Sequence, residues 1–195
     1  MLIIKKMKIR ELFNNDIKLD DNEWNSIQNL LIERSFKKGE YLVSEGEVEN
    51  YINLIVEGVC RVYCLKKGIE YTYVFALEHE WISSYESFTY NMPSHEYVQA
   101  VTNMKVYSIH RDNLKFLFSL NSKFTILERY VLNQIINDKT KRLRSFVIDS
   151  PEEMYLELLK KKPNLVQNIP LKYLATYIGI TAESLSRLRK RLVQK

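Results

Sequence analysis

Four cationic side chains lie within five residues near the end of the sequence, at Arg187, Arg189, Lys190 and Arg191. Arginine can donate two parallel hydrogen bonds to a guanine edge, and any of these cations can contact a phosphate. Glu183 lies four residues before Arg187, so a helix would place both side chains on one face. These residue types at this spacing are typical of a helix that enters the major groove of DNA.

The residues around these cations predict a helix-turn-helix that would position them. Gly179 suits the sharp turn, because glycine adopts a left-handed backbone conformation at little cost. Thr181 is placed to cap the second helix. Apolar residues recur at helical spacing on both sides of the turn: Leu171, Leu174, Ala175 and Ile178 before it, and Leu185, Leu188 and Leu192 after it. The alternative is a small helical hairpin with a solvated basic face.

We predict that the start and the polar face of the second helix contact DNA. Thr181 and Ser184 would approach phosphates at the helix N-terminus. Arg187 would read guanine, while Glu183 would either accept a hydrogen bond from a cytosine amine or hold Arg187 in place. Cations nearer the helix end, Arg189 among them, would contact phosphates. The predicted DNA-contacting set is Thr181, Glu183, Ser184, Ser186, Arg187, Lys190 and Arg191.

Charge is divided unevenly along the chain. Residues 139–195 contain 13 Lys or Arg and 5 Asp or Glu, a net charge of +8, whereas residues 1–138 contain 16 and 19, a net charge of −3. This asymmetry predicts a polyanionic partner for the C-terminal end alone.

The composition, 46% hydrophobic and 27% charged, is typical of a soluble globular protein. No apolar run approaches the ~18 residues of a membrane span, and the opening residues MLIIKKMK have too short an apolar core for a signal peptide. We therefore expect a cytoplasmic protein that has no membrane partner. Cys60 and Cys64 are interpreted as packing residues, since a cytoplasmic disulfide is rare and no histidine lies nearby.

The remaining segments predict an antiparallel β-roll between helices. A capped amphipathic helix is expected over residues 21–34. Short segments rich in Tyr, Val and Ile follow, separated by glycines, and predict strands at 41–43, 51–56, 59–65, 69–77, 97–101 and 105–110. Further helices are expected at 111–120, 123–146 and 151–162, the last of them ended by Pro163.

The long helix over 123–146 has an apolar stripe that allows two interpretations. It could lie on the roll, or it could pair with its own copy as a short coiled coil. We predict the second, a homodimer joined along this helix, because a two-fold symmetric DNA reader needs two half-site helices. The stripe consists of Phe124, Leu127, Val131, Ile135, Leu143 and Phe146.

This order of parts resembles the Crp/Fnr family of bacterial transcription factors. The resemblance rests on residues 38–63, KGEYLVSEGEVENYINLIVEGVCRVY, and on residues 180–192, ITAESLSRLRKRL. Glu183 and Arg187 occupy the family's base-reading positions, whereas Ala182 replaces a frequent first-turn arginine. The sequence ends three residues after Leu192, so we expect a shortened helix-turn-helix domain that lacks the hairpin wing of many members.

The resemblance implies an α+β protein with three parts. The first is an antiparallel β-roll of the cyclic-nucleotide-binding, jelly-roll type with flanking helices at residues 1–120. The second is a dimerisation helix at 121–149. The third is a small helical helix-turn-helix DNA-binding domain at 150–195.

The expected nucleotide pocket departs from the family. Members that bind cyclic nucleotides use a Gly-Glu pair for the ribose and an Arg-Ser pair for the phosphate, but here Ser83-Ser84 and Ser94-His95 stand at those places. Without the arginine nothing neutralises a buried phosphate, so we predict independence from cyclic AMP. A shift of two residues would make Glu86 the ribose ligand without supplying an arginine. The possible effector pocket comprises Trp81, Ser83, Ser84, Tyr85, Glu86, Ser94 and His95.

The sequence therefore predicts a sequence-specific DNA-binding transcription regulator. Its expected partners are double-stranded DNA with a two-fold symmetric site, a second copy of itself and RNA polymerase. The alternative is a small-molecule-binding or protein-interaction module whose helix pair no longer reads DNA. An enzyme is not expected, because the sequence lacks a catalytic triad order, metal-ligand spacing and a phosphate-binding loop, and no cofactor or metal is indicated.

Overall fold

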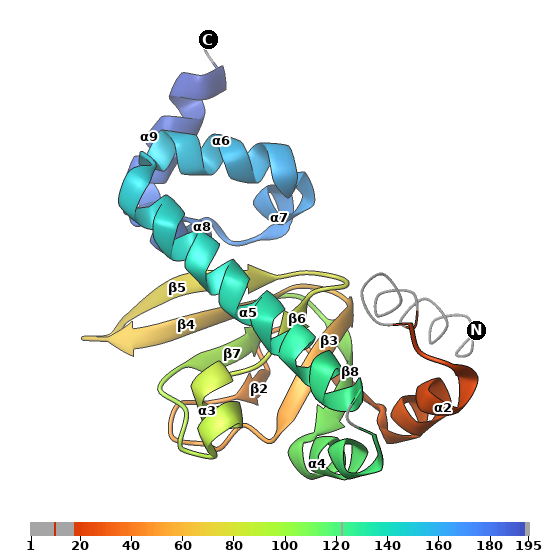
Figure 1. The fold of residues 1–195 in the computed structure, drawn as a ribbon. Coiled ribbons are helices and arrows are strands. Elements are labelled where there is room, and N and C mark those ends of the chain that lie inside the picture. Colours follow the sequence, from red (N-terminus) through yellow and green to blue (C-terminus); the bar gives the residue numbers. More distant parts are fainter. Residues whose placement is uncertain (1–9, 11–17, 122, 194–195) are drawn as a thin grey trace.

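The computed structural model describes Arg10, residues 18–121 and residues 123–193 (Figure 1). Helix α2, Asp21–Leu30, begins with a capping box in which Asp20 and Glu23 satisfy each other's backbone N–H groups. The predicted helix over 21–34 is too long, because Leu31 is extended and strand β1, Ile32–Phe36, follows it. Residues 32–36 pair antiparallel with β8, so tertiary strand pairing overrides the local helical pattern here.

The predicted antiparallel roll is confirmed. The described residues form two four-stranded antiparallel sheets, ordered β1-β8-β3-β6 and β2-β7-β4-β5. The strands after β1 are β2 (Tyr41–Val43), β3 (Tyr51–Glu57), β4 (Cys60–Lys66), β5 (Ile69–Ala76), β6 (Trp81–Ile82), β7 (Tyr97–Ala100) and β8 (Met104–His110).

Small and branched side chains fill the space between the two sheets. The central members Ile55, Cys60, Val62, Val98 and Val106 are all fully buried. Burial raises the pKa of the Cys60 thiol, which is free, as is Cys64. The two cysteines thus form no disulfide, and Cys60 serves as a packing residue as expected.

Two short elements between β5 and β7 were not predicted. Strand β6 contributes only Trp81 and Ile82, which pair with Leu54 and Asn53 of β3. Helix α3, Tyr85–Tyr90, follows at once and ends at Asn91 in the left-handed conformation. Segments of two and six residues are too short to give a periodic apolar pattern.

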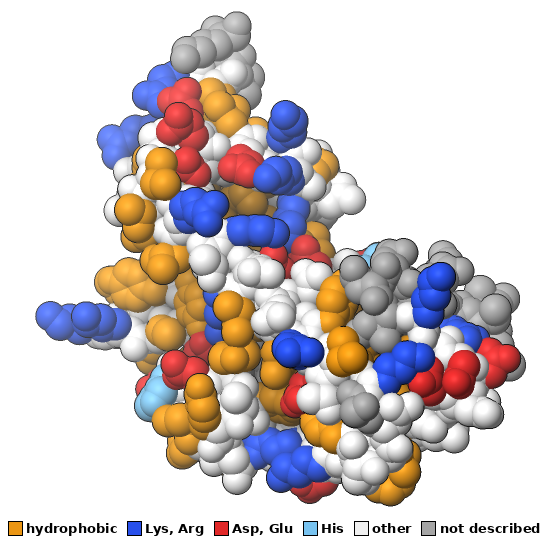
Figure 2. Space-filling model, in the orientation of Figure 1, with side chains coloured by type: hydrophobic (Ala, Val, Ile, Leu, Met, Phe, Trp, Pro, Cys, Tyr) orange, Lys and Arg blue, Asp and Glu red, His pale blue; other side chains and the backbone are white. Residues whose placement is uncertain are grey.

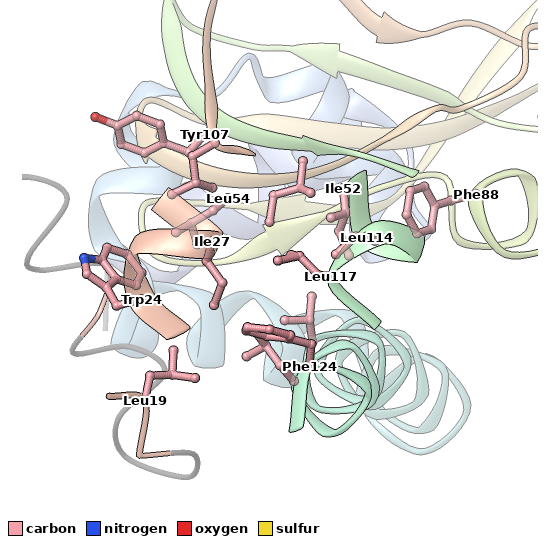
Figure 3. Close-up of a cluster of buried hydrophobic side chains, with 14 of the residues drawn as sticks. Leu19, Trp24, Ile27, Ile52, Leu54, Phe88, Tyr107, Leu114, Leu117 and Phe124 are labelled. Carbon is pink, nitrogen blue, oxygen red and sulfur yellow. The ribbon is translucent and has the colours of Figure 1, made fainter. Parts of the chain in front are cut away.

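Helices α4 (Arg111–Leu120) and α5 (Lys123–Ile148) follow the roll. The first half of α5 packs on the roll, where Phe124 joins Trp24 and Ile27 of α2 and Leu117 of α4 in one apolar cluster (Figure 3). The other predicted stripe residues of this half, Leu127, Val131 and Ile135, belong to the same cluster. These side chains are therefore core residues of the roll, and the prediction that they form a dimer seam is wrong.

In the described residues after α5 the structure has helices α6 (Pro151–Lys161), α7 (Pro163–Asn168), α8 (Leu171–Ile178) and α9 (Ala182–Val193). Pro163 ends α6 as predicted, and it also begins α7, which the sequence did not indicate. Their shared core includes Phe75 and Val101 of the roll, so the helices are packed onto the sheet that contains β5 (Figure 1). No helix in the described ranges combines the length and hydropathy that a membrane span requires.

Candidate nucleic-acid interface

Helices α8 and α9 form the predicted helix-turn-helix. Gly179 ends α8 with a φ of +84°, and its N–H bonds back to the carbonyls of Ala175 and Thr176. A side chain at this position would also collide with Phe146 of α5, because a Cβ built on Gly179 lies 2.7 Å from the Phe146 ring. The turn therefore needs glycine for its backbone conformation, and a larger residue would also have to displace the exposed Phe146 ring.

Thr181 caps α9 as the sequence indicates. Its Oγ1 accepts a hydrogen bond from the Ser184 backbone N–H at 3.2 Å and lies 3.1 Å from the Ser184 hydroxyl. The Glu183 backbone N–H, the Thr181 hydroxyl and the charge of Arg187 lower the pKa of the Glu183 carboxyl. The first turn of α9 thus presents an ionised carboxylate, and the N–H groups of Glu183, Ser184 and Leu185 have partners within the helix start.

The leucines in the middle of α9 are buried and the charged residues on its opposite side are exposed, as predicted. Leu185 and Leu188 are buried against Leu174, Ala175 and Ile178 of α8. The outer face carries Glu183, Arg187 and Lys190, which are exposed and recur at i, i+4 and i+7. Within the described part of the chain, Arg187 and Lys190 have no carboxylate partner within 4.0 Å, so both charges are available to a ligand.

The cations at the end of α9 differ in their surroundings. Arg189 is half-buried, donates to the Val166 carbonyl at 3.1 Å and lies over the Tyr155 ring at 5.5 Å. The expectation that Arg189 faces phosphates is therefore wrong, because it closes the C-terminal end of α7 instead. Arg191 is exposed but forms an ion pair with Glu152 of α6.

A shallow surface hollow lies beside the exposed face of α9. Leu171 of α8 lines it together with Ala182, Glu183, Ser186 and Arg187. Several Lys and Arg side chains gather in the upper, C-terminal part of the molecule in Figure 2, with fewer Asp and Glu side chains among them. An exposed surface with unpaired cations is the electrostatic feature that a polyanion such as a DNA duplex binds.

The structure does not bring all the residues predicted for an effector pocket into one cavity, and only Ser84 and Ser94 among them bond each other. The hydroxyls of Ser84 and Ser94 are 2.9 Å apart, and both residues are buried. Ser83 is also buried and donates to the Tyr51 carbonyl at 3.1 Å. Glu86 and His95 are exposed, and Tyr85 is half-buried. Trp81 lines a different cavity, described below.

Comparison with known proteins identifies the roll. Residues 33–121 match the family model of the cyclic nucleotide-binding domain. No curated protein sequence matches the chain.

Solved structures match nearly the whole chain. FixK2 from Bradyrhizobium japonicum superposes with a TM-score of 0.69 and 18% identity, over 84% of this chain and 85% of its own. A putative Crp/Fnr-family transcriptional regulator from Eubacterium rectale superposes with a TM-score of 0.71 and 17% identity, over 93% of this chain and 87% of its own. The c-di-GMP-responsive global regulator CLP of Xanthomonas campestris superposes with a TM-score of 0.70 and 15% identity, over 90% of this chain and 92% of its own.

The chain has the fold of the Crp/Fnr regulators. The resemblance inferred from the sequence is confirmed at this level, including the order of roll, long helix and C-terminal helices. Within the Crp/Fnr fold, the two base-reading positions implied by the resemblance, Glu183 and Arg187, both lie on the exposed face of α9. The seven predicted DNA-contacting residues remain a prediction for this chain.

Proposed function

We propose that this protein is a sequence-specific DNA-binding transcription regulator that acts as a homodimer and does not depend on cyclic AMP. The observation that carries the proposal is the exposed face of α9, where Arg187 and Lys190 are unpaired among the described residues. A guanidinium one turn into a capped helix can reach guanine O6 and N7, while the ammonium can neutralise a phosphate. The Crp/Fnr fold supports the same conclusion.

The homodimer rests on a second face of α5. Ile136, Leu143 and Val147 are exposed and recur at i, i+7 and i+11, so they form one outward stripe. At about 100° per residue, Ile136 lies about 100° around the helix from Ile135 and about 140° from Val131, which are both buried. Two copies of α5 would bury the exposed stripe in a parallel pair and place two α9 helices for two half-sites.

Independence from cyclic nucleotides rests on Ser84 and Ser94. The resemblance puts the ribose-binding glutamate and the phosphate-binding arginine of other members at these two positions. Their hydroxyls bond each other here, and neither serine carries the charge that would neutralise a phosphate. We expect calorimetry to find no micromolar site for cyclic AMP or cyclic GMP, and detection of such a site would contradict this part of the proposal.

Selection of DNA from a random duplex library by the purified protein tests the proposal directly. The expected result is an enriched motif with two-fold symmetry, whose half-sites are centred about one helical turn apart. Enrichment without a motif would show non-specific binding alone. Absence of enrichment at low salt would favour a module that no longer reads DNA.

A further inference from the structure

A cavity of about 280 Å³ lies where the roll, α5 and the C-terminal helices meet. Strands β5 and β6 form one wall, α5 forms another, and α6 with Tyr177 of α8 completes it (Figure 1). Its volume lies just below the usual range of small-molecule sites, about 300–1,000 Å³, so only a small ligand fits. Apolar side chains line all the walls, among them Phe75, Ala76, Trp81, Ile135, Met154 and Leu158.

The charged side chains around this cavity are nearly all paired. Five cations and three carboxylates line it. Four of the cations have a carboxylate within 4.0 Å: Lys162 has Glu80 at 2.7 Å, Lys141 has Asp138 at 3.8 Å, Lys139 has Glu96 at 3.3 Å and Lys161 has Glu157. These pairs leave one positive charge uncompensated.

That charge belongs to Arg142, which no carboxylate approaches within 4.0 Å in the described parts of the chain. Its guanidinium lies 4.0 Å from the centre of the Tyr177 ring, and its Nη1 lies 3.4 Å from the Met154 sulfur. Its Nε is buried and has no hydrogen-bond partner. Burial lowers the pKa of this guanidinium, which reflects the unfavourable placement of an unpaired charge. The guanidinium thus lines the cavity as a cation that no carboxylate neutralises, and such a cation is a partner for an anion.

We propose that this cavity binds a small organic acid with a single carboxylate on an apolar body. The carboxylate accepts hydrogen bonds from Arg142, and the body lies against Trp81, Ile135 and Met154. A monoanion matches the single uncompensated charge. A phosphate dianion does not, because it carries one negative charge more than the single uncompensated cation balances.

The position of the cavity gives its ligand a route to α9. Tyr177 belongs to α8, which packs directly on α9, while Trp81 belongs to the roll. An acid bound between them contacts both parts, so it favours the arrangement in which they are this close. An effect of the acid on DNA binding through α9 rests on the proposed function, whereas binding of the acid itself does not.

Calorimetry of the purified protein without DNA tests the site. The probes are indole-3-acetate, 4-phenylbutyrate and octanoate, each compared with its neutral amide. We expect one-site binding of at least one acid and at least about tenfold weaker binding of its amide, since a charged hydrogen bond is removed. Arg142→Met keeps an apolar contact with Tyr177 and should weaken binding of the acid by a similar factor. Arg144→Met is the matched control, because Arg144 is exposed on the same helix and does not line the cavity.

Each outcome decides the proposal. It is overturned if none of the three acids binds, if acid and amide bind equally, or if folded Arg142→Met binds the acid as the wild type does. Should Arg142→Met fail to fold, the comparison of acid and amide on the wild-type protein decides alone. A failure of the chain to bind DNA leaves these measurements unaffected, so the two proposals fail separately.

Discussion

Glu49 is a carboxylate held inside the roll. The residue is 2% exposed, its Oε1 accepts a hydrogen bond from the Tyr51 backbone N–H at 2.9 Å, and the Ser84 backbone N–H also acts on the carboxylate. Burial raises the pKa of Glu49 to about 7, against the lowering effect of the Tyr51 N–H and of Arg34. The folded protein therefore binds this proton more tightly than the unfolded chain does.

This shift predicts a loss of stability as the pH rises. The contribution of Glu49 is fully present below its unfolded pKa of 4.5 and is lost as the pH passes through about 7. The loss amounts to about 3 kcal/mol of unfolding free energy, at about 1.4 kcal/mol per pKa unit. Glu49→Gln, which imitates the protonated form, should remove this part of the pH dependence in urea unfolding between pH 4.5 and about 8.

Glu78→Gln is the control for that experiment, because Glu78 is exposed. It should leave the pH dependence unchanged. If Glu49→Gln retained the full wild-type slope, the raised pKa of Glu49 would be refuted.

Two cations on the exposed face of α9 should differ in what they contribute to DNA binding. Arg187→Ala should cost about 1–3 kcal/mol on the selected duplex and relax the preference at one base pair of each half-site. Lys190→Ala should weaken all duplexes alike and reduce the salt dependence by about one unit for each phosphate that the lysine neutralises. Fluorescence anisotropy on cognate and scrambled duplexes at several salt concentrations measures both effects.

Lys66→Ala serves as the control, since Lys66 is an exposed cation at the β4–β5 turn of the roll. Equal loss of affinity on both duplexes for Arg187→Ala would leave Arg187 only a phosphate-binding role.

The sequence distinguished the faces of α9 better than it distinguished the individual cations. The leucine spacing gave the buried face, and hence the exposure of Arg187 and Lys190. It could not show that Arg189 turns back to the Val166 carbonyl, because α7 has no periodic pattern and its position depends on tertiary packing.

At the scale of elements, helix α5 has two apolar faces with different roles. Val131 and Ile135 are 4% exposed in the core of the roll, whereas Ile136 and Leu143 face outward. The double variant Ile136→Glu, Leu143→Glu should therefore give folded monomers in sedimentation, because like charges would face each other across the pair. Gln134→Glu is the control, since Gln134 is exposed and lies about 160° around the helix from Ile136.

The buried face gives the opposite expectation. Ile135→Ala should lower the unfolding free energy by about 2–5 kcal/mol through loss of core packing and should not dissociate the dimer directly. Chemical denaturation measures the first effect and sedimentation at native conditions the second. A dimer that persists in the double glutamate variant would show that α5 does not join the copies.

The sequence predicted that α5 is long and apolar along one side, but it could not say what covers that side. A stripe at helical spacing looks the same whether it packs on a sheet or on a second helix. The same limit explains residues 31–36, where an apolar pattern continues past α2 but the pairing of β1 with β8 makes the segment a strand. The roll itself was predictable, because its strands are bounded by glycines that adopt positive φ, as at Gly58 and Gly68.

At the scale of the whole molecule, the C-terminal helices are docked on the roll through a buried arginine. Arg61 of β4 is fully buried and pairs with Glu70 at 2.7 Å. Its guanidinium also lies between two rings, 4.0 Å from the centre of Tyr63 in the roll and 3.5 Å from that of Tyr173 in α8. Arg61 therefore contributes to the core of the roll and to the docking of α8 at once.

A nearby hydrogen bond reports on this docking. The backbone N–H of Thr72 in β5 donates to the Thr176 hydroxyl of α8 at 3.4 Å. Thr72 itself is 2% exposed. When α8 leaves the sheet, this amide loses its acceptor and its cover together, so its hydrogen exchange measures how often the two parts separate.

Tyr173→Ala should make that separation more frequent. Removing the ring uncovers the Arg61 guanidinium, and a desolvated cation–π contact contributes about 2 kcal/mol. Exchange at Thr72 should accelerate by about one to two orders of magnitude. Exchange at Val106, in the centre of the roll, should stay slow, because its strand pairs with β1 and β3 and not with α8. Tyr90→Ala, at an exposed tyrosine of α3, should change neither amide. Equal acceleration at Thr72 and Val106 would mean that Tyr173 stabilises the whole fold and that docking is not a separable step.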